Sequence, residues 1–300
     1  MNHYFQPSET WKTVVLRTVH EIGDDNCLGL AAQLAFYFLL ALFPALLFFV
    51  ALLGYLPVEN AFDKLLSALS AVTPPELVEL VQDQLEQIGQ GNHGSLLTLG
   101  IVGAIWSSSA AIVAIIDALN RAYDVTEWRT WWKRRLVAIL LTLALAMFTL
   151  VSLALVLIGP DLASTIVAWL GLTPAAGVVW VIVRWPLMII CVVVGVDLVY
   201  HFAPNKKERW VWITPGSLLA TTLWMGNSFA FKLYVTNFAN YTATYGTIGA
   251  VIVAMLWFYV SSLAILIGAE LNGVIEQAWR ARGGPNPSEA APETVEAPPR

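Results

Sequence analysis

The sequence predicts an all-α membrane protein with six transmembrane helices and both termini in the cytoplasm. Of its 300 residues, 58% are hydrophobic and only 12% are charged, whereas an average soluble domain carries about 25% charged residues. So few charges cannot cover the surface of a soluble fold of this size. The second observation is a series of apolar segments of near-bilayer length, and the third is the distribution of Lys and Arg between them.

The N-terminal residues 1–27 are predicted to form a cytoplasmic amphipathic segment ahead of the membrane domain. Ser8 can cap a helix over residues 8–25. The apolar residues of this helix recur at helical spacing and are Trp11, Val14, Val15, Thr18, Val19 and Ile22. A single apolar stripe of this kind is typical of a helix that lies in the membrane interface.

The membrane domain is expected to cover residues 28–275. Each of its apolar runs is close to the ~20 residues that cross a bilayer as a helix. The runs comprise residues 28–54, 95–118, 136–158, 178–200, 214–234 and 247–270. Pro44 and Pro186 fall inside the first and fourth runs, and proline in a membrane helix frees a carbonyl and tends to kink the helix.

Basic residues set the predicted orientation. They gather before the first run, in the loops over residues 119–135 and 201–213, and after the last run. Positively charged loops face the cytoplasm, so both termini are expected there. The basic and aromatic stretch RTWWKRRL at residues 129–136 leads directly into the third run. It is therefore interpreted as a membrane-interface sequence and not as a nucleic-acid site, in line with the net charge of −5.

Two further segments complete the chain. Residues 55–94, between the first two spans, show two amphipathic helical patterns and are expected to lie on the outer membrane surface or to cover the bundle. Residues 276–300 are rich in Pro, Ala and Glu and poor in bulky apolar residues. They are predicted to form a disordered cytoplasmic tail.

Three stretches resemble one protein family. They are AAQLAFYFLLALFPALL at residues 31–47, LNRAYDVTEWRTWWKRRLVAILLT at residues 119–142 and YGTIGAVIVAMLWFYVSSLAILIGAELN at residues 245–272. Together they resemble the YihY/BrkB family of bacterial inner-membrane proteins over about residues 10–275. The resemblance implies a multi-pass protein of the inner membrane. Some members of that family have carried the label ribonuclease BN.

Acidic residues near the inner ends of three spans are the first candidate site. Asp117, Asp197 and Glu270 end the second, fourth and sixth runs, which all cross in the same direction. If these helices are neighbours, the three carboxylates would meet at one depth and could bind a cation or a proton. The alternative is local neutralisation, of Asp117 by Arg121 and of Asp197 by His201.

Cations nearer the outer side are the second candidate site. Arg184 lies about two turns inside the fourth span, and Lys232 lies near the outer end of the fifth. Arg binds phosphate and carboxylate groups in bidentate geometry, which favours an anionic ligand, although both cations could instead extend to the interface. Asn227 and Ser108, in the middle of their spans, could contribute hydrogen bonds to that ligand or to helix packing.

These residues favour transport or lipid handling of an anionic ligand. The first alternative is a membrane scaffold that moves nothing, in which the same charges serve packing and anchoring. The second is a membrane-associated ribonuclease. The sequence offers no nucleophile–base pair, metal-ligand motif or phosphate-binding loop, so we expect no enzyme, cofactor, metal or nucleic-acid partner. The expected partners are membrane lipids and an anionic lipid or small solute.

Overall fold

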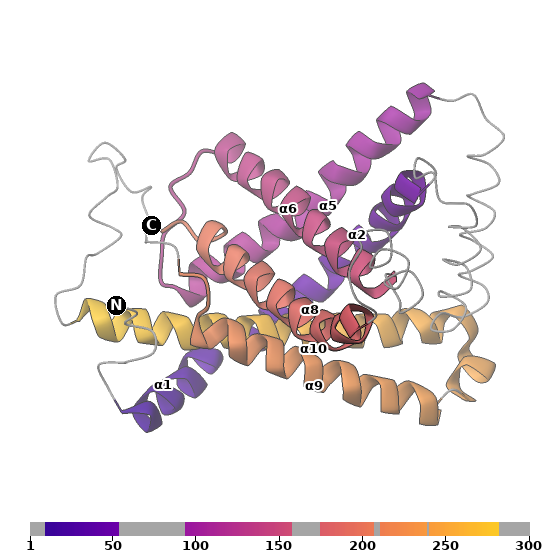
Figure 1. Cartoon of the computed structure of the whole chain (residues 1–300). Helices are drawn as coiled ribbons and strands as arrows, with labels where there is room; N and C mark the ends of the chain where they lie inside the picture. The colour runs from indigo at the N-terminus through magenta and orange to yellow at the C-terminus, as the bar shows by residue number, and fades with distance from the viewer. Residues whose placement is uncertain (1–9, 54–93, 158–174, 207–210, 239, 282–300) are drawn as a thin grey trace.

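A computed structural model describes residues 10–53, 94–157, 175–206, 211–238 and 240–281. These parts of the chain form seven α-helices (Figure 1). The helices are α1 (Trp11–Asp24), α2 (Cys27–Leu53), α5 (Gly94–Ala122), α6 (Trp131–Leu157), α8 (Ala175–Phe202), α9 (Pro215–Phe238) and α10 (Asn240–Arg280). The predicted outer segment at residues 55–94 and most of the predicted tail lie outside the described residues.

Six of these helices coincide with the six apolar runs, from α2 to α10. Among the residues whose side chains are described, three stretches are long and apolar enough to cross a membrane by themselves, namely Trp131–Ser152, Ile182–Phe202 and Val251–Arg280. Helices α1 and α2 meet at 64° and would count as a fourth if they formed one bent span. The all-helical membrane class is thus confirmed, while the number of six spans remains a prediction.

Helix α10 differs most from its predicted bounds. The sequence placed the end of the membrane domain at residue 275, but the helix continues without a break to Arg280. Its last turns are not a polar tail, because Val274, Ile275 and Ala278 are buried. Helix α1 covers this segment through the buried Val14, and Arg17 Nη2 donates a hydrogen bond of 2.9 Å to Gln277 Oε1.

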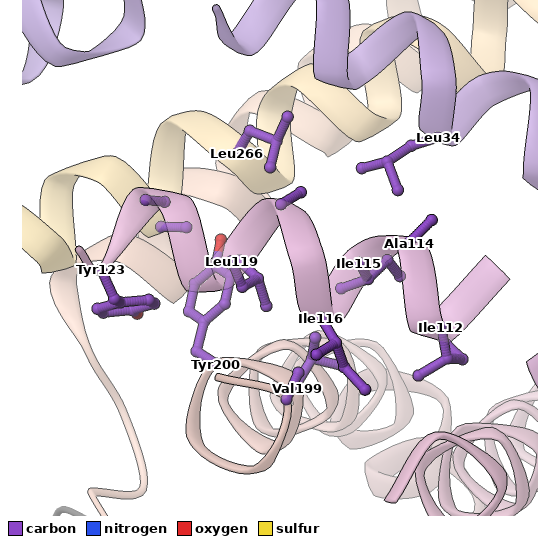
Figure 2. Close-up of a cluster of buried hydrophobic side chains, with 14 of the residues drawn as sticks. Leu34, Ile112, Ala114, Ile115, Ile116, Leu119, Tyr123, Val199, Tyr200 and Leu266 are labelled. Carbon is purple, nitrogen blue, oxygen red and sulfur yellow. The ribbon is translucent and has the colours of Figure 1, made fainter. Parts of the chain in front are cut away.

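The hydrophobic core lies near one end of the bundle, where α2, α5, α8 and α10 meet (Figure 2). Ile116 and Leu119 of α5 lie at its centre, with Leu266 of α10 on one side and Tyr200 of α8 on the other. Leu34 of α2 extends the same cluster. Ala138 and Leu141 of α6 and Ala220 of α9 also belong to this core, which thus joins six helices.

Helices α9 and α10 approach closely because glycines face each other. A Cβ atom built on Gly216 would lie 2.1 Å from the backbone oxygen of Gly268, and one built on Gly268 would lie 2.4 Å from the oxygen of Gly216. No side chain fits at such distances, and small residues let membrane helices approach this closely. Gly273 serves the same purpose against Ala122 of α5, where the built Cβ lies 2.2 Å from the carbonyl oxygen.

Candidate functional site

Asp197 occupies a buried polar junction between α8, α9 and α10. Thr214 Oγ1 donates a hydrogen bond of 2.6 Å to Asp197 Oδ1, and it accepts hydrogen bonds from Asn272 Nδ2 at 2.9 Å and Ser217 N at 3.2 Å. Asn272 Oδ1 in turn accepts from Gly216 N at 2.9 Å. Thr214 and Ser217 thus cap the N-terminus of α9, and that cap also positions the carboxylate of Asp197.

Glu270 lies on α10 but faces a different neighbour. Its carboxylate accepts a hydrogen bond of 3.2 Å from Cys27 Sγ, at the start of α2. Both side chains are buried. Glu270 therefore ties the first turn of α2 to α10, beside the bend between α1 and α2.

Asp117 is exposed and forms an ion pair with α6. Its Oδ2 lies 2.5 Å from Arg134 Nη2. Arg135, which follows Arg134 on α6, stacks over the ring of Trp106, with its guanidinium carbon 4.0 Å from the ring centroid. Its Nη2 also donates a hydrogen bond to the backbone oxygen of Trp106. Two cations of the RTWWKRRL stretch thus fasten the first turn of α6 to α5.

The loop after α5 contains a second polar network. Arg129 donates to both oxygens of Glu127, at 2.8 and 2.7 Å, and also to the backbone oxygen of Ala203 at 2.7 Å. Asn120 Nδ2 donates to Glu127 Oε2 at 2.9 Å, and Asn120 Oδ1 accepts from Asn205 N at 2.7 Å. Burial alone would raise the pKa of Glu127, but the hydrogen bonds from Arg129 and Asn120 outweigh it, so this pKa lies below its ordinary value.

A fully buried carboxylate with two cations lies at the end of α10. Glu276 Oε1 is 2.5 Å from Lys206 Nζ, and Glu276 Oε2 is 3.1 Å from Arg280 Nη2. Lys206 Nζ also lies 3.6 Å from the ring centroid of Tyr123, within the range of a cation–π contact. This Lys206–Glu276–Arg280 cluster joins α10 to the loop after α8 and to the end of α5.

Arg184 lies on a stretch of α8 whose other side chains face outward. Ile182 and Trp185 are 65% and 59% exposed, whereas Arg184 is half-buried. Its guanidinium carbon is 5.6 Å from the centroid of the Trp185 ring. Its Nε is buried and has no hydrogen-bond partner among the described residues, although such buried donors are normally satisfied.

Two of the other residues predicted for this ligand site, Asn227 and Ser108, form no contact with Arg184 in the described part of the chain. Asn227 Nδ2 donates to Ser261 Oγ at 3.3 Å, which links α9 to α10. Ser108 is half-buried on α5, and the side chain of Lys232 on α9 lies outside the described residues. Within the described ranges, no hydrogen bond or ion pair connects Arg184 with Asn227 or Ser108.

The three predicted inner acids have separate partners in the structure. Asp117 pairs with α6, Asp197 with the cap of α9, and Glu270 with the start of α2. No hydrogen bond joins any two of them in the part of the chain that the structure describes. The partner of Asp117 is Arg134 instead of the expected Arg121, because α6 folds back against α5 and brings its first turn alongside. Whether these acids bind an ion remains a prediction.

Sequence reasoning missed the Glu127 network and the Lys206–Glu276–Arg280 cluster. The composition of residues 276–300 predicts a tail that includes Glu276, and no local spacing predicts that Asn120, Glu127 and Asn205 are partners. The sequence spacing indicates one of these contacts, because Glu276 and Arg280 are four residues apart and oppositely charged residues at that spacing pair on a helix. The contacts of Lys206 and Asn205 depend on the return of the chain after α8, which no local pattern reveals. No group of three metal-ligating side chains occurs within the described ranges.

The apolar helices and their buried polar junctions define an all-helical, multi-pass membrane protein. The chain belongs to the BrkB family, because the family model described as "Virulence factor BrkB" matches residues 18–293. This confirms the resemblance inferred from the three sequence stretches.

Relatives agree with this class. The chain is 37% identical over 260 residues to "Putative ribonuclease-like protein YfkH" of Bacillus subtilis, covering 87% of this chain and 92% of the relative. It is 30% identical over 259 residues to a UPF0761 membrane protein of Aeromonas salmonicida, covering 84% of each. It is 28% identical to a UPF0761 membrane protein of Ralstonia nicotianae, covering 88% of this chain and 59% of that relative. No solved structure matches.

Proposed function

We propose that this protein crosses the bacterial inner membrane six times, with both termini in the cytoplasm, and binds and moves an anionic lipid or small anionic solute. The observation that carries the proposal is Arg184. It is a half-buried cation among outward-facing apolar side chains, and, unlike Arg134 and Arg280, it forms no ion pair with any described residue. A charge at membrane depth is costly and is a functional candidate by default.

The chemistry of Arg184 favours an anion that offers at least two oxygens. Phosphate and carboxylate groups accept paired hydrogen bonds from the planar guanidinium group. Pro186 follows two residues later and lacks an N–H, so it leaves the carbonyl of Ile182 without its usual helical donor. The helix is therefore suited to local distortion next to the cation.

The proposed orientation is supported by the residues around the end of the bundle that holds the polar networks. Trp131, Trp132 and Trp212 are exposed there, and Trp is enriched at membrane–water interfaces. Lys206, Arg129 and Arg134 belong to the same end and provide the positive charge expected on the cytoplasmic side.

The test measures binding with the purified full chain in a neutral detergent. Phosphatidylglycerol, phosphatidylcholine and inorganic phosphate are added separately, and thermal unfolding is followed by tryptophan fluorescence. A ligand that binds only the folded state raises the melting temperature. We expect stabilisation by phosphatidylglycerol if the ligand is a lipid, or by phosphate if it is a solute, and loss of the effect in Arg184→Ala.

The control is Arg121→Ala. This variant removes an exposed arginine from the last turn of α5, whereas Arg184 lies on α8. It should keep the full response to the anion. An equal response of Arg184→Ala and wild type would contradict a ligand contact at Arg184. Failure of any anion to stabilise the wild type would favour the scaffold alternative.

The name of the Bacillus subtilis relative raises ribonuclease activity as a second candidate. We propose binding and not catalysis, because the exposed acid Asp117 is already engaged by Arg134. Cleavage of RNA by the purified protein that is abolished in Asp117→Asn would revive the enzyme hypothesis.

A further inference from the structure

Asp197 is a buried carboxylate with one satisfied oxygen and one unsatisfied oxygen. Its side chain is only 2% exposed, and Oδ1 accepts the hydrogen bond from Thr214. Oδ2 is buried and has no hydrogen-bond partner among the described residues. Within the same residues, no Lys, Arg or His forms an ion pair with Asp197. A buried charge of this kind requires a compensating positive charge.

The described side chains around Asp197 supply no full positive charge, and the N-terminus of α9 contributes only a partial one. The hydroxyl hydrogen of Thr214 is directed to Oδ1, because Asn272 Nδ2 and Ser217 N, which are donors only, already occupy its lone pairs. Ser217 lies close to the carboxylate, but its hydroxyl donates to the backbone oxygen of Thr214 at 2.9 Å. The junction therefore fixes the position of the carboxylate and leaves Oδ2 available to a ligand.

A second unsatisfied oxygen lies on the same face of α9. Thr221 follows Thr214 by seven residues, two helical turns along that face. It is 4% exposed, and its Oγ1 has no partner in the described part of the chain. Its neighbour Thr222 is exposed and donates to Leu218 O at 2.7 Å, the usual way in which a threonine in a helix satisfies itself. Thr221 forms no such bond.

The same face continues toward the other end of α9. Ser228 lies seven residues beyond Thr221, and its Oγ is also buried without a partner among the described residues. Thr214, Thr221 and Ser228 thus place oxygen atoms at regular intervals from Asp197 along the helix. Carboxylate and hydroxyl oxygens are suitable ligands for hard cations, and such a row suits water or an ion passing along the helix.

We propose that Asp197 Oδ2 and Thr221 Oγ1 form a binding site for one small monovalent cation, a proton or Na⁺, at the junction of α8, α9 and α10. Carboxylates inside membrane-spanning helices commonly mark ion pathways and proton relays, and Asp197 is a buried carboxylate of α8 beside the first turn of α9. The ion binding itself is independent of Arg184. Only its use to drive transport depends on the proposed function.

The titratable and charged groups of the adjoining elements are few. On α8, Tyr200 donates its hydroxyl to Ile265 O at 2.5 Å, and His201 follows it in the last turn. On α10, Glu270 faces Cys27 of α2. On α6, Arg134 pairs with Asp117. Helix α9 carries no charged residue from Pro215 to Phe231. Comparison of wild type with an Asp197 variant therefore isolates the contribution of Asp197.

The experiment follows thermal unfolding of the purified full chain in detergent. One series replaces choline chloride by NaCl at constant pH and ionic strength, and the other raises the pH from about 6 to about 8 without Na⁺. A cation bound only by the folded state raises the melting temperature as its concentration rises. If Na⁺ is the ligand, NaCl should stabilise the wild type. If it is a proton, the melting temperature should fall as the pH rises.

Asp197→Asn keeps an oxygen for Thr214 but removes the charge. It should therefore abolish the Na⁺ dependence if Na⁺ is the ligand, or reduce the pH dependence to the part that Glu270 contributes if the ligand is a proton. Thr221→Val should weaken the same dependence, and it decides the question if the Asp197 variant does not fold. Thr222→Val is the matched control and should leave it unchanged. The proposal is overturned if the wild type responds to neither ion. It is equally overturned if Asp197→Asn responds to the ion like the wild type. If Asp197→Asn does not fold, a wild-type response of Thr221→Val overturns the proposal instead.

Discussion

Lys206 and Glu276 form an ion pair that is removed from solvent: Nζ lies 2.5 Å from Oε1, and the two side chains are 3% and 0% exposed. They are 70 residues apart in the sequence. The pair joins the loop after α8 to the last turns of α10, where Arg280 binds the second carboxylate oxygen. The end of α10 is thus part of the folded bundle.

Removal of the charge of Glu276 should strongly destabilise the protein. Glu276→Gln removes the buried negative charge that Lys206 and Arg280 both contact, and breaking one side of a buried ion pair costs about 3–5 kcal/mol. The free energy of unfolding can be measured by denaturant titration in mixed micelles. The double variant Glu276→Leu with Lys206→Met should recover part of the loss, because the buried charge of Lys206 is then removed together with that of Glu276, and only the more exposed Arg280 loses a partner. A double variant less stable than Glu276→Gln would contradict this explanation.

The glycine contact between α9 and α10 should tolerate no side chain. Gly268→Ala places a Cβ against the backbone oxygen of Gly216 and the hydroxyl of Tyr200, so the helices must separate, at a cost of about 1–3 kcal/mol for overpacking. Gly226→Ala is the matched control on α9, because nothing lies within 4 Å of its built Cβ. It should be neutral or slightly stabilising, since alanine favours helix more than glycine does. Equal thermal shifts for the two variants would be inconsistent with the close contact.

The Glu127 network should make stability depend on pH in the acidic range. The pKa of Glu127 is lowered in the folded state, so its contribution is fully present above the pKa of the unfolded chain, about 4.3. It is lost as the pH falls from there through the lower folded value. The difference in unfolding free energy between wild type and Glu127→Gln should therefore shrink on acidification. A constant difference down to low pH would show that the charge of Glu127 is not what stabilises the loop.

The docking of α1 on α10 should depend on Arg17. Its hydrogen bond to Gln277 joins the two helices, and Gln277 Nε2 donates a further hydrogen bond of 2.5 Å to Asp124 Oδ2. Arg17→Ala should increase hydrogen exchange in residues 11–24 by roughly ten- to a hundred-fold, since a hydrogen bond to a charged group contributes about 1.5–3 kcal/mol. Lys12→Ala, an exposed cation on the same helix, is the control. Unchanged exchange in the Arg17 variant would mean that apolar contacts alone hold α1.

The helices could be predicted from the sequence because each has its own local signal. Apolar length defines α6, α8 and α10, and the stripe around Val14 defines α1. The side-chain pairings were harder to predict. Asp197, Glu270 and Asp117 share a depth in the sequence pattern, but each turns to a different neighbour, and that choice follows from helix packing around glycines such as Gly268 and Gly273. The burial of Glu276 likewise depends on Lys206, which arrives from another part of the chain.

The central claim is that Arg184 contacts an anionic ligand, and native mass spectrometry tests it most directly. The full chain would be extracted gently from its own membrane and compared with Arg184→Ala and with Arg184→Lys, which keeps the charge but loses the planar group. We predict a specific anionic lipid or solute on the wild type, less of it on Arg184→Lys and none on Arg184→Ala. The same adduct at equal abundance on all three folded proteins would contradict the claim.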